Sequence, residues 1–120
     1  MVFLATFAGL TALMRLPIGP IRADPETRAL YRDGLAEALT VARARGVGLP
    51  DDFVSATLAR TDQLPEGMKS SMLGDLERGK RLELAWLSGT IVRMAAELGV
   101  PTPVHGLIAT ALKLHANGRG

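Results

Sequence analysis

The sequence predicts an all-α fold, a single bundle-like domain of five to six helices. Three observations lead to this prediction. Apolar residues make up 48% of the chain but aromatic residues only 4%, so the core must be built mainly from aliphatic side chains, many of them good helix formers. Helix start and stop signals recur along the chain. No segment alternates apolar and polar positions with β-branched enrichment, so no sheet is expected.

The first half of the chain predicts two long helices. Residues 1–15 are apolar on all sides, as in a helix buried in an interior. This first helix is expected to end before Pro17-Ile18-Gly19-Pro20, four residues that cannot continue a helix, so no helix is predicted there. Asp24-Pro25-Glu26 then supplies an N-cap, a proline at the first helical position and an early acid, and the second helix runs from there to Gly46.

The second half predicts four further helices and a loop over residues 61–69. The clearest helix covers residues 83–98, where apolar residues recur at helical spacing. The first of the four expected helices is opened by Pro50-Asp51-Asp52 and runs through Leu58. The second runs from Met72 to about Glu77 and is capped by Ser70 or Ser71. The third covers residues 83–98, and the fourth is capped by Thr102 and runs to about His115.

The charge distribution argues against nucleic acid as a partner. The net charge of +2 arises from 14 basic and 12 acidic residues, and acidic residues flank the densest basic run, residues 78–81. A phosphate-binding surface needs unopposed positive charge. Mixed, solvated helix faces are therefore expected, and no nucleic-acid partner.

The composition also predicts a soluble, cytoplasmic chain. The apolar N-terminal stretch stops at Arg15, short of the roughly 18–20 apolar residues that a membrane span needs. It lacks the positive first region of a signal peptide. The absence of cysteine excludes disulfides and thiolate metal sites and suits a reducing compartment. No membrane partner is expected.

Metal, cofactor and catalytic motifs find no support. His105 and His115 lie ten positions apart, which does not match the i, i+4 spacing of a helical metal pair, and both are expected at the surface or partly buried. Gly46-Val47-Gly48 follows a helix instead of a strand and lacks the third glycine of a dinucleotide loop. No serine has a histidine and an acid at a signature spacing.

Residues 70–83 are the segment that can carry chemistry. They are polar and charged and contain two glycines. A serine at a helix N-terminus can donate to an anion beside free backbone N–H groups, and Glu83 can accept hydrogen bonds from a hydroxyl or an ammonium group. The alternative interpretation is a capped short helix followed by a charged turn, and composition alone favours it.

These residues carry a resemblance to a known family. Ser71-Met72-Leu73-Gly74-Asp75-Leu76 followed by Gly79-Lys80-Arg81-Leu82-Glu83 resembles the signature of the C-terminal domain of ketopantoate reductase (2-dehydropantoate 2-reductase). Flanking pieces resemble the family in the same order, so the resemblance covers nearly the whole chain. These pieces are Leu10-Thr11-Ala12-Leu13 with Pro17-Ile18-Gly19, Glu37 with Val41-Ala42 and Gly46, Ser88-Gly89, and Gly99-Val100-Pro101-Thr102-Pro103.

The resemblance implies that residues 1–120 form an all-α domain like the C-terminal domain of 6-phosphogluconate dehydrogenase. Such a domain binds substrate and forms homodimers in an NADPH-dependent oxidoreductase that reduces 2-dehydropantoate, a small 2-oxo acid, to pantoate in pantothenate biosynthesis. Carried over by position, Ser71 contacts the substrate carboxylate. Glu83 hydrogen-bonds near the reacting centre and helps to hold the catalytic lysine.

Some parts of the family pattern are expected outside this chain or are replaced in it. The family lysine aligns before Met1, and the N-terminal Rossmann domain that would hold NADPH is absent, so no catalytic or cofactor-binding residue is predicted here. The asparagines that follow the lysine are replaced by Leu4 and Ala8, which cannot hydrogen-bond substrate hydroxyls.

Two hypotheses follow. The first is a substrate-binding domain of a ketopantoate-reductase-like enzyme, inactive as this isolated chain. The alternative is a stand-alone, non-catalytic helical dimerisation or interaction module derived from such an enzyme. The all-apolar first helix motivates the alternative, because it would leave an apolar patch that self-association could cover.

Overall fold

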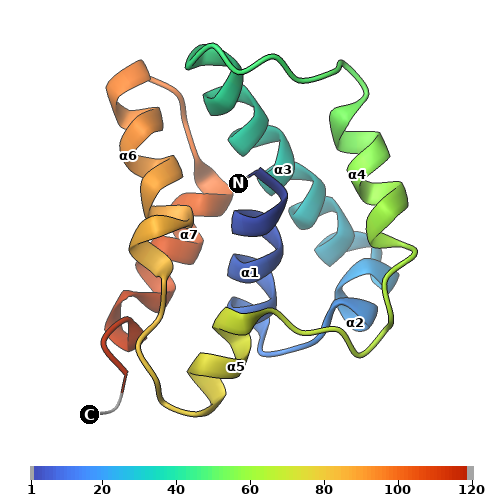
Figure 1. Ribbon diagram of the computed structural model, residues 1–120, viewed down its shortest axis with the longest axis vertical. Coiled ribbons are helices and arrows are strands. Elements are labelled where there is room, and N and C mark those ends of the chain that lie inside the picture. The colour runs from blue at the N-terminus through green and yellow to red at the C-terminus, as the bar shows by residue number, and fades with distance from the viewer. Residues whose placement is uncertain (1, 119–120) are drawn as a thin grey trace.

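The computed structural model describes residues 2–118, and this part of the chain is all-α, as the sequence predicts. It contains seven α-helices and two short 3₁₀ helices, with no strand among the described residues (Figure 1). The α-helices are α1 (Val2–Met14), α2 (Ile18–Ala23), α3 (Pro25–Ala44), α4 (Phe53–Thr61), α5 (Ser71–Glu77), α6 (Ser88–Leu98) and α7 (Pro103–Leu112). The 3₁₀ helices are η1 (Leu84–Trp86) and η2 (Lys113–His115).

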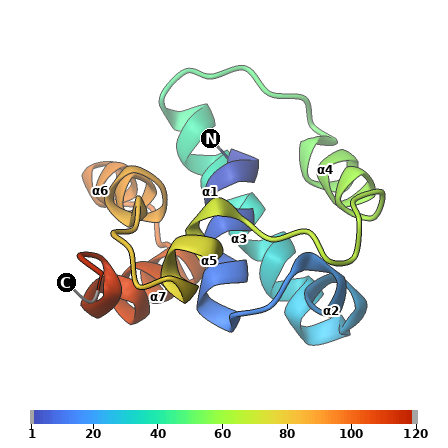
Figure 2. The same ribbon diagram turned by 60° about the horizontal axis from the view of Figure 1, so that its bottom comes forward.

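Helix α1 is the centre of the fold. It packs against α3, α5 and α7, and Figures 1 and 2 both show it surrounded by its neighbours. Nine of its 13 residues are buried and none is charged. This confirms the predicted buried first helix, although Met1 lies outside the described residues. None of the helices within residues 2–118 combines the length and the apolar character needed to cross a membrane.

Helix α2 occupies the segment that was predicted to hold no helix. Pro17 is its N-cap and Pro20 is its third residue. The first N–H groups of a helix have no intrahelical acceptor, so a proline costs little at these positions. The N–H groups of Ile18 and Gly19 donate instead to the loop before α5, to the carbonyls of Met68 (3.0 Å) and Glu66 (2.9 Å). This helix raises the count above the predicted five to six.

The predicted helix over residues 83–98 is broken. Leu87 has φ −109° and ψ −102°, so the chain forms η1 before it and α6 after it. Leu84 and Ile91 are both buried, so the apolar period continues across the break. Periodicity alone therefore gave no sign of the break. The last predicted helix is right in extent, but it tightens from α7 into η2 after Leu112.

The start of α7 is capped by a residue from another helix. Thr102, the predicted cap, makes no side-chain cap bond. Glu37 of α3 takes its place, with Oε2 accepting from the N–H of Val104 at 2.7 Å and Oε1 from the N–H of His105 at 2.9 Å. A carboxylate at a helix N-terminus satisfies donors that have no intrahelical partner and complements the helix dipole.

Candidate functional site

Ser71, the first predicted site residue, opens α5 and is exposed. Its neighbour Ser70 is the one that caps the helix, because Ser70 Oγ accepts from the N–H of Leu73 at 3.0 Å. Ser70 is buried, and its Oγ lies 2.6 Å from Oγ1 of Thr11 in α1, which ties α5 to the central helix. The Ser71 hydroxyl makes no hydrogen bond to another residue in the described part of the chain. The fold therefore uses Ser70 and leaves Ser71 available.

Glu83, the second predicted site residue, lies immediately before η1 and is exposed. It borders a hollow of about 400 Å³ that contains two carboxylates, one guanidinium group and an indole. The lining residues are Asp75, Arg81, Leu82, Glu83, Ala85 and Trp86. Carboxylates accept hydrogen bonds, so this hollow suits a ligand that presents hydroxyl or ammonium donors.

Ser71 and Glu83 lie on one segment but do not meet. The segment runs through α5 and then on to η1, and α5 packs against α1 (Figures 1 and 2). Ser71 is absent from the residues that line the Glu83 hollow. No hydrogen bond joins the two side chains within residues 2–118. Their joint action on one substrate is therefore a prediction that rests on the family resemblance.

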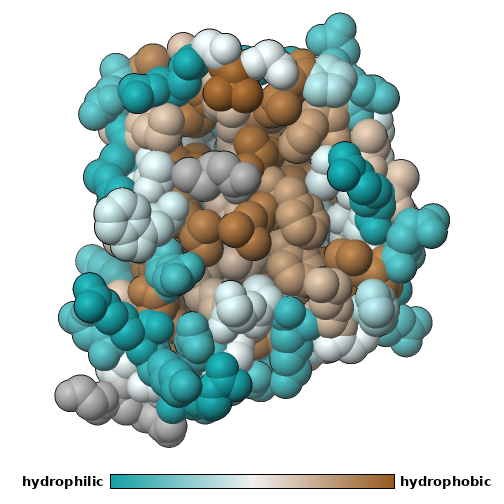
Figure 3. Space-filling view, in the orientation of Figure 1, coloured by the Kyte–Doolittle hydropathy of each residue, from teal (hydrophilic) through white to brown (hydrophobic). Residues whose placement is uncertain are grey.

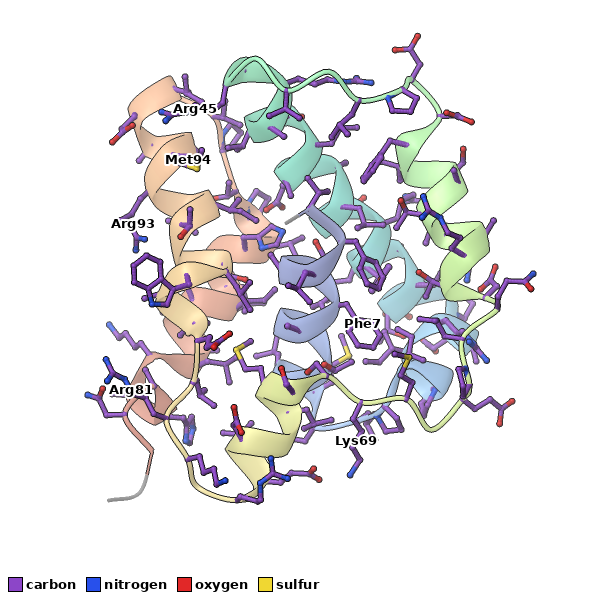
Figure 4. The ribbon with its side chains drawn as sticks, viewed as in Figure 1. Phe7, Arg45, Lys69, Arg81, Arg93 and Met94 are labelled. Carbon is purple, nitrogen blue, oxygen red and sulfur yellow. The ribbon has the colours of Figure 1, made fainter. Side chains whose placement is uncertain are left out.

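Trp86 lies on this surface and was not among the predicted site residues. It is the only tryptophan of the chain and is 75% exposed. Figure 4 shows Arg81 and Arg93 along the same edge of the molecule as η1, both extending outward. Arg93 is held in place by the carbonyl of Ala85, at 2.9 Å from Nη2. The available signal was the single tryptophan three positions after Glu83.

A second hollowed region, beside the N-terminal half of α1, is apolar. A pocket of about 340 Å³ and another of about 310 Å³ share Phe3 and Phe53 in their walls. Figure 3 shows apolar side chains gathered on this face over α1, within a more polar rim. Arg45 and Met94 belong to the larger pocket and lie near each other in Figure 4. This surface suits an apolar partner.

The two histidines occupy different environments. His115 is exposed, but His105 is completely buried, so the expectation of a surface or partly buried position is wrong for His105. Its side chain is satisfied inside the fold by groups from other helices, which local sequence does not reveal. Among residues 2–118, no group of three His, Cys, Asp or Glu side chains is placed to hold a metal ion.

Comparison with known proteins identifies the family. Residues 1–116 match the family model described as the C-terminal part of ketopantoate reductase PanE/ApbA. The chain is 36% identical over 95 residues to a 2-dehydropantoate 2-reductase from Mycobacterium tuberculosis, covering 79% of this chain and 32% of the relative. It is 31% identical over 114 residues to an uncharacterized oxidoreductase from Bacillus subtilis, covering 95% and 38%. The chain thus spans about a third of the length of these curated relatives.

Solved structures agree with this result. A dimeric ketopantoate reductase from Staphylococcus aureus matches with a TM-score of 0.89 and 28% identity, covering 96% of this chain and 40% of that one. A 2-dehydropantoate 2-reductase from Geobacter metallireducens matches with a TM-score of 0.86 and 32% identity, covering 94% and 38%. The described helices are therefore similar, in order and arrangement, to one part of these longer proteins. This chain belongs to the ketopantoate reductase family, of which it forms the all-helical C-terminal domain.

Proposed function

We propose that this chain is the substrate-binding domain of an NADPH-dependent oxidoreductase that reduces 2-dehydropantoate, or a similar small 2-oxo acid, to its 2-hydroxy acid. The observation that supports the proposal most is the family match over residues 1–116. In this proposal the domain is not catalytically complete alone. A Rossmann domain is its partner, and the complete enzyme works as a cytoplasmic homodimer.

The residues that the structure describes do not fit a dinucleotide. Gly46 and Gly48 are exposed in a loop that follows α3. Pyrophosphate binding needs a strand, a glycine turn and a helix N-terminus together, and the described residues contain no strand. The proposal therefore assigns NADPH to the Rossmann domain, and assigns to this chain the binding and orientation of the substrate.

Ser71 and Glu83 are the proposed substrate contacts. The Ser71 hydroxyl, free of the capping role, donates to the substrate carboxylate beside the N–H groups of the first turn of α5. The exposed Glu83 carboxylate accepts a hydrogen bond near the reacting centre and helps to orient the catalytic ammonium group. Both roles come from the family resemblance and are supported here by exposure.

Helix α1 bears on which 2-oxo acid is bound. Leu4 is 51% exposed and Ala8 is buried, and neither side chain can hydrogen-bond a ligand. A substrate hydroxyl buried against these positions without a partner would cost about 1–3 kcal/mol. Two ligands therefore test whether the site accepts a substrate hydroxyl. One is 2-dehydropantoate, and the other is 3,3-dimethyl-2-oxobutanoate, which has the same skeleton without the hydroxyl.

The adjacent serines give the sharpest test of the proposed site. We expect Ser71→Ala to change the free energy of unfolding by no more than about 0.5 kcal/mol, because Ser71 makes no bond that the fold uses. The same change should weaken 2-oxo acid binding about tenfold or more, since a hydrogen bond to a charged group contributes about 1.5–3 kcal/mol. Ser70→Ala should instead cost about 0.5–2 kcal/mol of stability through loss of the cap.

Binding is measured on the 120-residue chain by NMR titration of the backbone amides of α5 and η1, and stability by urea unfolding. Ser55→Ala, at an exposed serine of α4 whose hydroxyl donates only to the exposed carbonyl of Asp52 at 3.0 Å, is the control; it should leave binding unchanged and alter the free energy of unfolding by no more than about 0.5 kcal/mol. If both 2-oxo acids leave the amides of residues 71–86 unmoved, or if Ser71→Ala binds them like the wild type, the proposed site is wrong.

A second candidate function is a non-catalytic dimerisation or interaction module. The observation in its favour is the apolar face over α1, with its two pockets lined by Phe3 and Phe53. Contiguous apolar surfaces of this kind commonly mark interaction sites. In this function the face would be covered by a second copy of the chain.

Under this alternative, we expect light scattering of the chain at micromolar concentration to give the mass of a dimer. Met94→Glu places a charge in the larger pocket and should return the mass to that of a monomer. Leu114→Glu, at a position 86% exposed on η2, is the control and should leave the dimer intact. A wild-type chain that is strictly monomeric would exclude this alternative.

A further inference from the structure

His105 lies where four helices meet. It belongs to the first turn of α7 and has no exposed surface. Its Nε2 lies 2.9 Å from the carbonyl oxygen of Gly34 in α3 and 3.3 Å from Oγ1 of Thr6 in α1. Its Nδ1 lies 3.1 Å from Oγ of Ser88, the first residue of α6. One imidazole therefore joins α1, α3 and α6 to α7.

The partners of the ring are compatible with its neutral form. The Gly34 carbonyl can only accept, so Nε2 carries the hydrogen and donates it. Nδ1 then has a free lone pair and accepts the hydrogen of the Ser88 hydroxyl. The Thr6 hydroxyl donates to the carbonyl of Val2 at 3.0 Å. This is the arrangement of a neutral imidazole, which burial favours by lowering the pKa of His105.

Ser88 stands at the break that separates η1 from α6. Leu87, directly before it, has the non-helical backbone angles that interrupt the segment. Without that break, the apolar period of residues 83–98 predicts one continuous helix. The Ser88 hydroxyl is bonded inside the fold to His105, so this bond lies at the point from which η1, with Glu83 and Trp86, departs.

We propose that the hydrogen bond between Ser88 and His105 is a proton-sensitive latch that holds the Leu87 break in place and thereby positions Glu83 and Trp86. Addition of a proton at Nδ1 turns Nδ1 into a donor, so the Ser88 hydroxyl can only accept from it, and the hydroxyl hydrogen loses the acceptor that the fold gives it, beside a newly buried charge. The latch then opens, and η1 moves relative to α6. Only the consequence for a substrate at Glu83 rests on the proposed function; the latch itself does not.

The surroundings of His105 keep it neutral near pH 7. Burial lowers the pKa of His105 below its ordinary value of 6.5, opposed by its bond to the Gly34 carbonyl and by the charge of Glu37. Of the elements packed against α7, α1 and η1 contain no titratable side chain and α3 contributes Glu37. The charged residues Arg93 and Glu97 of α6, and Lys113 and His115 of η2, are exposed. Protonation therefore requires a pH below 6.5.

The sign of the pH effect on stability follows. The unfolded chain binds a proton at His105 more readily than the folded chain does. The stabilisation from neutral His105 is therefore complete above pH 6.5 and is lost as the pH falls through the lower folded value. The latch should open in the same range, before general acid unfolding.

The single tryptophan reports on the latch directly. We would follow the ring C–H signals of His105 by NMR and the emission of Trp86 on the same sample, from about pH 8 to pH 5. We expect a step in Trp86 emission whose midpoint coincides with that of His105, below pH 6.5, while helical circular dichroism stays constant. A His105 transition that leaves Trp86 unchanged, or one accompanied by loss of helix, would overturn the proposal.

Single substitutions test whether the Trp86 step is caused by protonation of His105. His105→Gln should abolish the Trp86 step, and His115→Gln should retain it. Ser88→Ala should leave the His105 titration in place but remove the Trp86 step, because it cuts the connection. A step that persists in His105→Gln would contradict the proposal, and if that variant does not fold, the coincidence of the wild-type midpoints decides. A chain that binds no 2-oxo acid but shows the Trp86 step refutes the proposed function and not the latch.

Discussion

Leu10→Ala is expected to lower the free energy of unfolding by about 2–5 kcal/mol, the largest effect of any single change considered for this chain. Leu10 is completely buried in α1, and α1 is the helix around which α3, α5 and α7 pack. Leucine and alanine have similar helix propensities, so the loss would come from the cavity and from the lost burial of the side chain. Urea unfolding with an unchanged denaturant dependence would measure it.

The same helix offers a matched control. Leu4 is 51% exposed, so Leu4→Ala should cost about 1 kcal/mol or less, because half of the side chain already faces solvent. If the two substitutions cost the same, α1 does not occupy the centre of the core in solution. A large cost for Leu4→Ala alone would show that the apolar face over α1 is covered, as the dimerisation alternative requires.

Local signals predicted most of the helical framework. Asp24 caps α3 as expected, with its carboxylate accepting from the N–H groups of Glu26 and Thr27 at 3.0 Å each. Gly99 ends α6 with a φ of +71°, a conformation that favours glycine over residues with a β-carbon. In both cases the cap residue and its partners lie within a few positions of one another, so the sequence alone contains the necessary information.

Features that depend on distant partners were missed. Helix α2 forms because carbonyls of Glu66 and Met68 take up its first N–H groups, and these residues are more than forty positions away in the chain. The Ser88 hydroxyl, directly after the break at Leu87, lies 3.1 Å from Nδ1 of His105 in α7. Neither partner can be assigned before the fold is known, whereas prolines and apolar periods can be read directly.

The candidate site likewise combines residues that could be predicted from the sequence with features that depend on the folded structure. The pair Ser71 and Glu83 came from the family resemblance, and the sequence could not decide which of two adjacent serines caps α5. Ser70 is the cap because its Oγ accepts from the N–H of Leu73, and the same Oγ is also bonded to Thr11 of α1, a partner that local sequence does not reveal. The hollow that unites Glu83 with Arg81 and Trp86 likewise depends on how the chain turns after α5.

Glu37→Ala is expected to lower the free energy of unfolding by about 2–4 kcal/mol, because it removes two hydrogen bonds from a charged acceptor at once. Each oxygen of the half-buried Glu37 carboxylate accepts one N–H at the start of α7. Removal would leave both donors without this partner and would remove one of the bonds that join α7 to α3, while that of His105 to the Gly34 carbonyl stays. Glu37→Gln keeps one acceptor oxygen without the charge, and should fall between the wild type and the alanine variant.

Glu97→Ala is the control for this prediction, measured by the same urea unfolding. Glu97 is exposed, and its Oε2 lies 3.6 Å from Nη1 of Arg45. Because exposed ion pairs contribute little, its removal should lower the free energy of unfolding by less than about 1 kcal/mol. If Glu37→Ala costs no more than Glu97→Ala, water replaces the carboxylate without loss and α7 does not depend on this cap. If it costs several times more, the first turn of α7, which carries His105, is held in position by a cap from another helix.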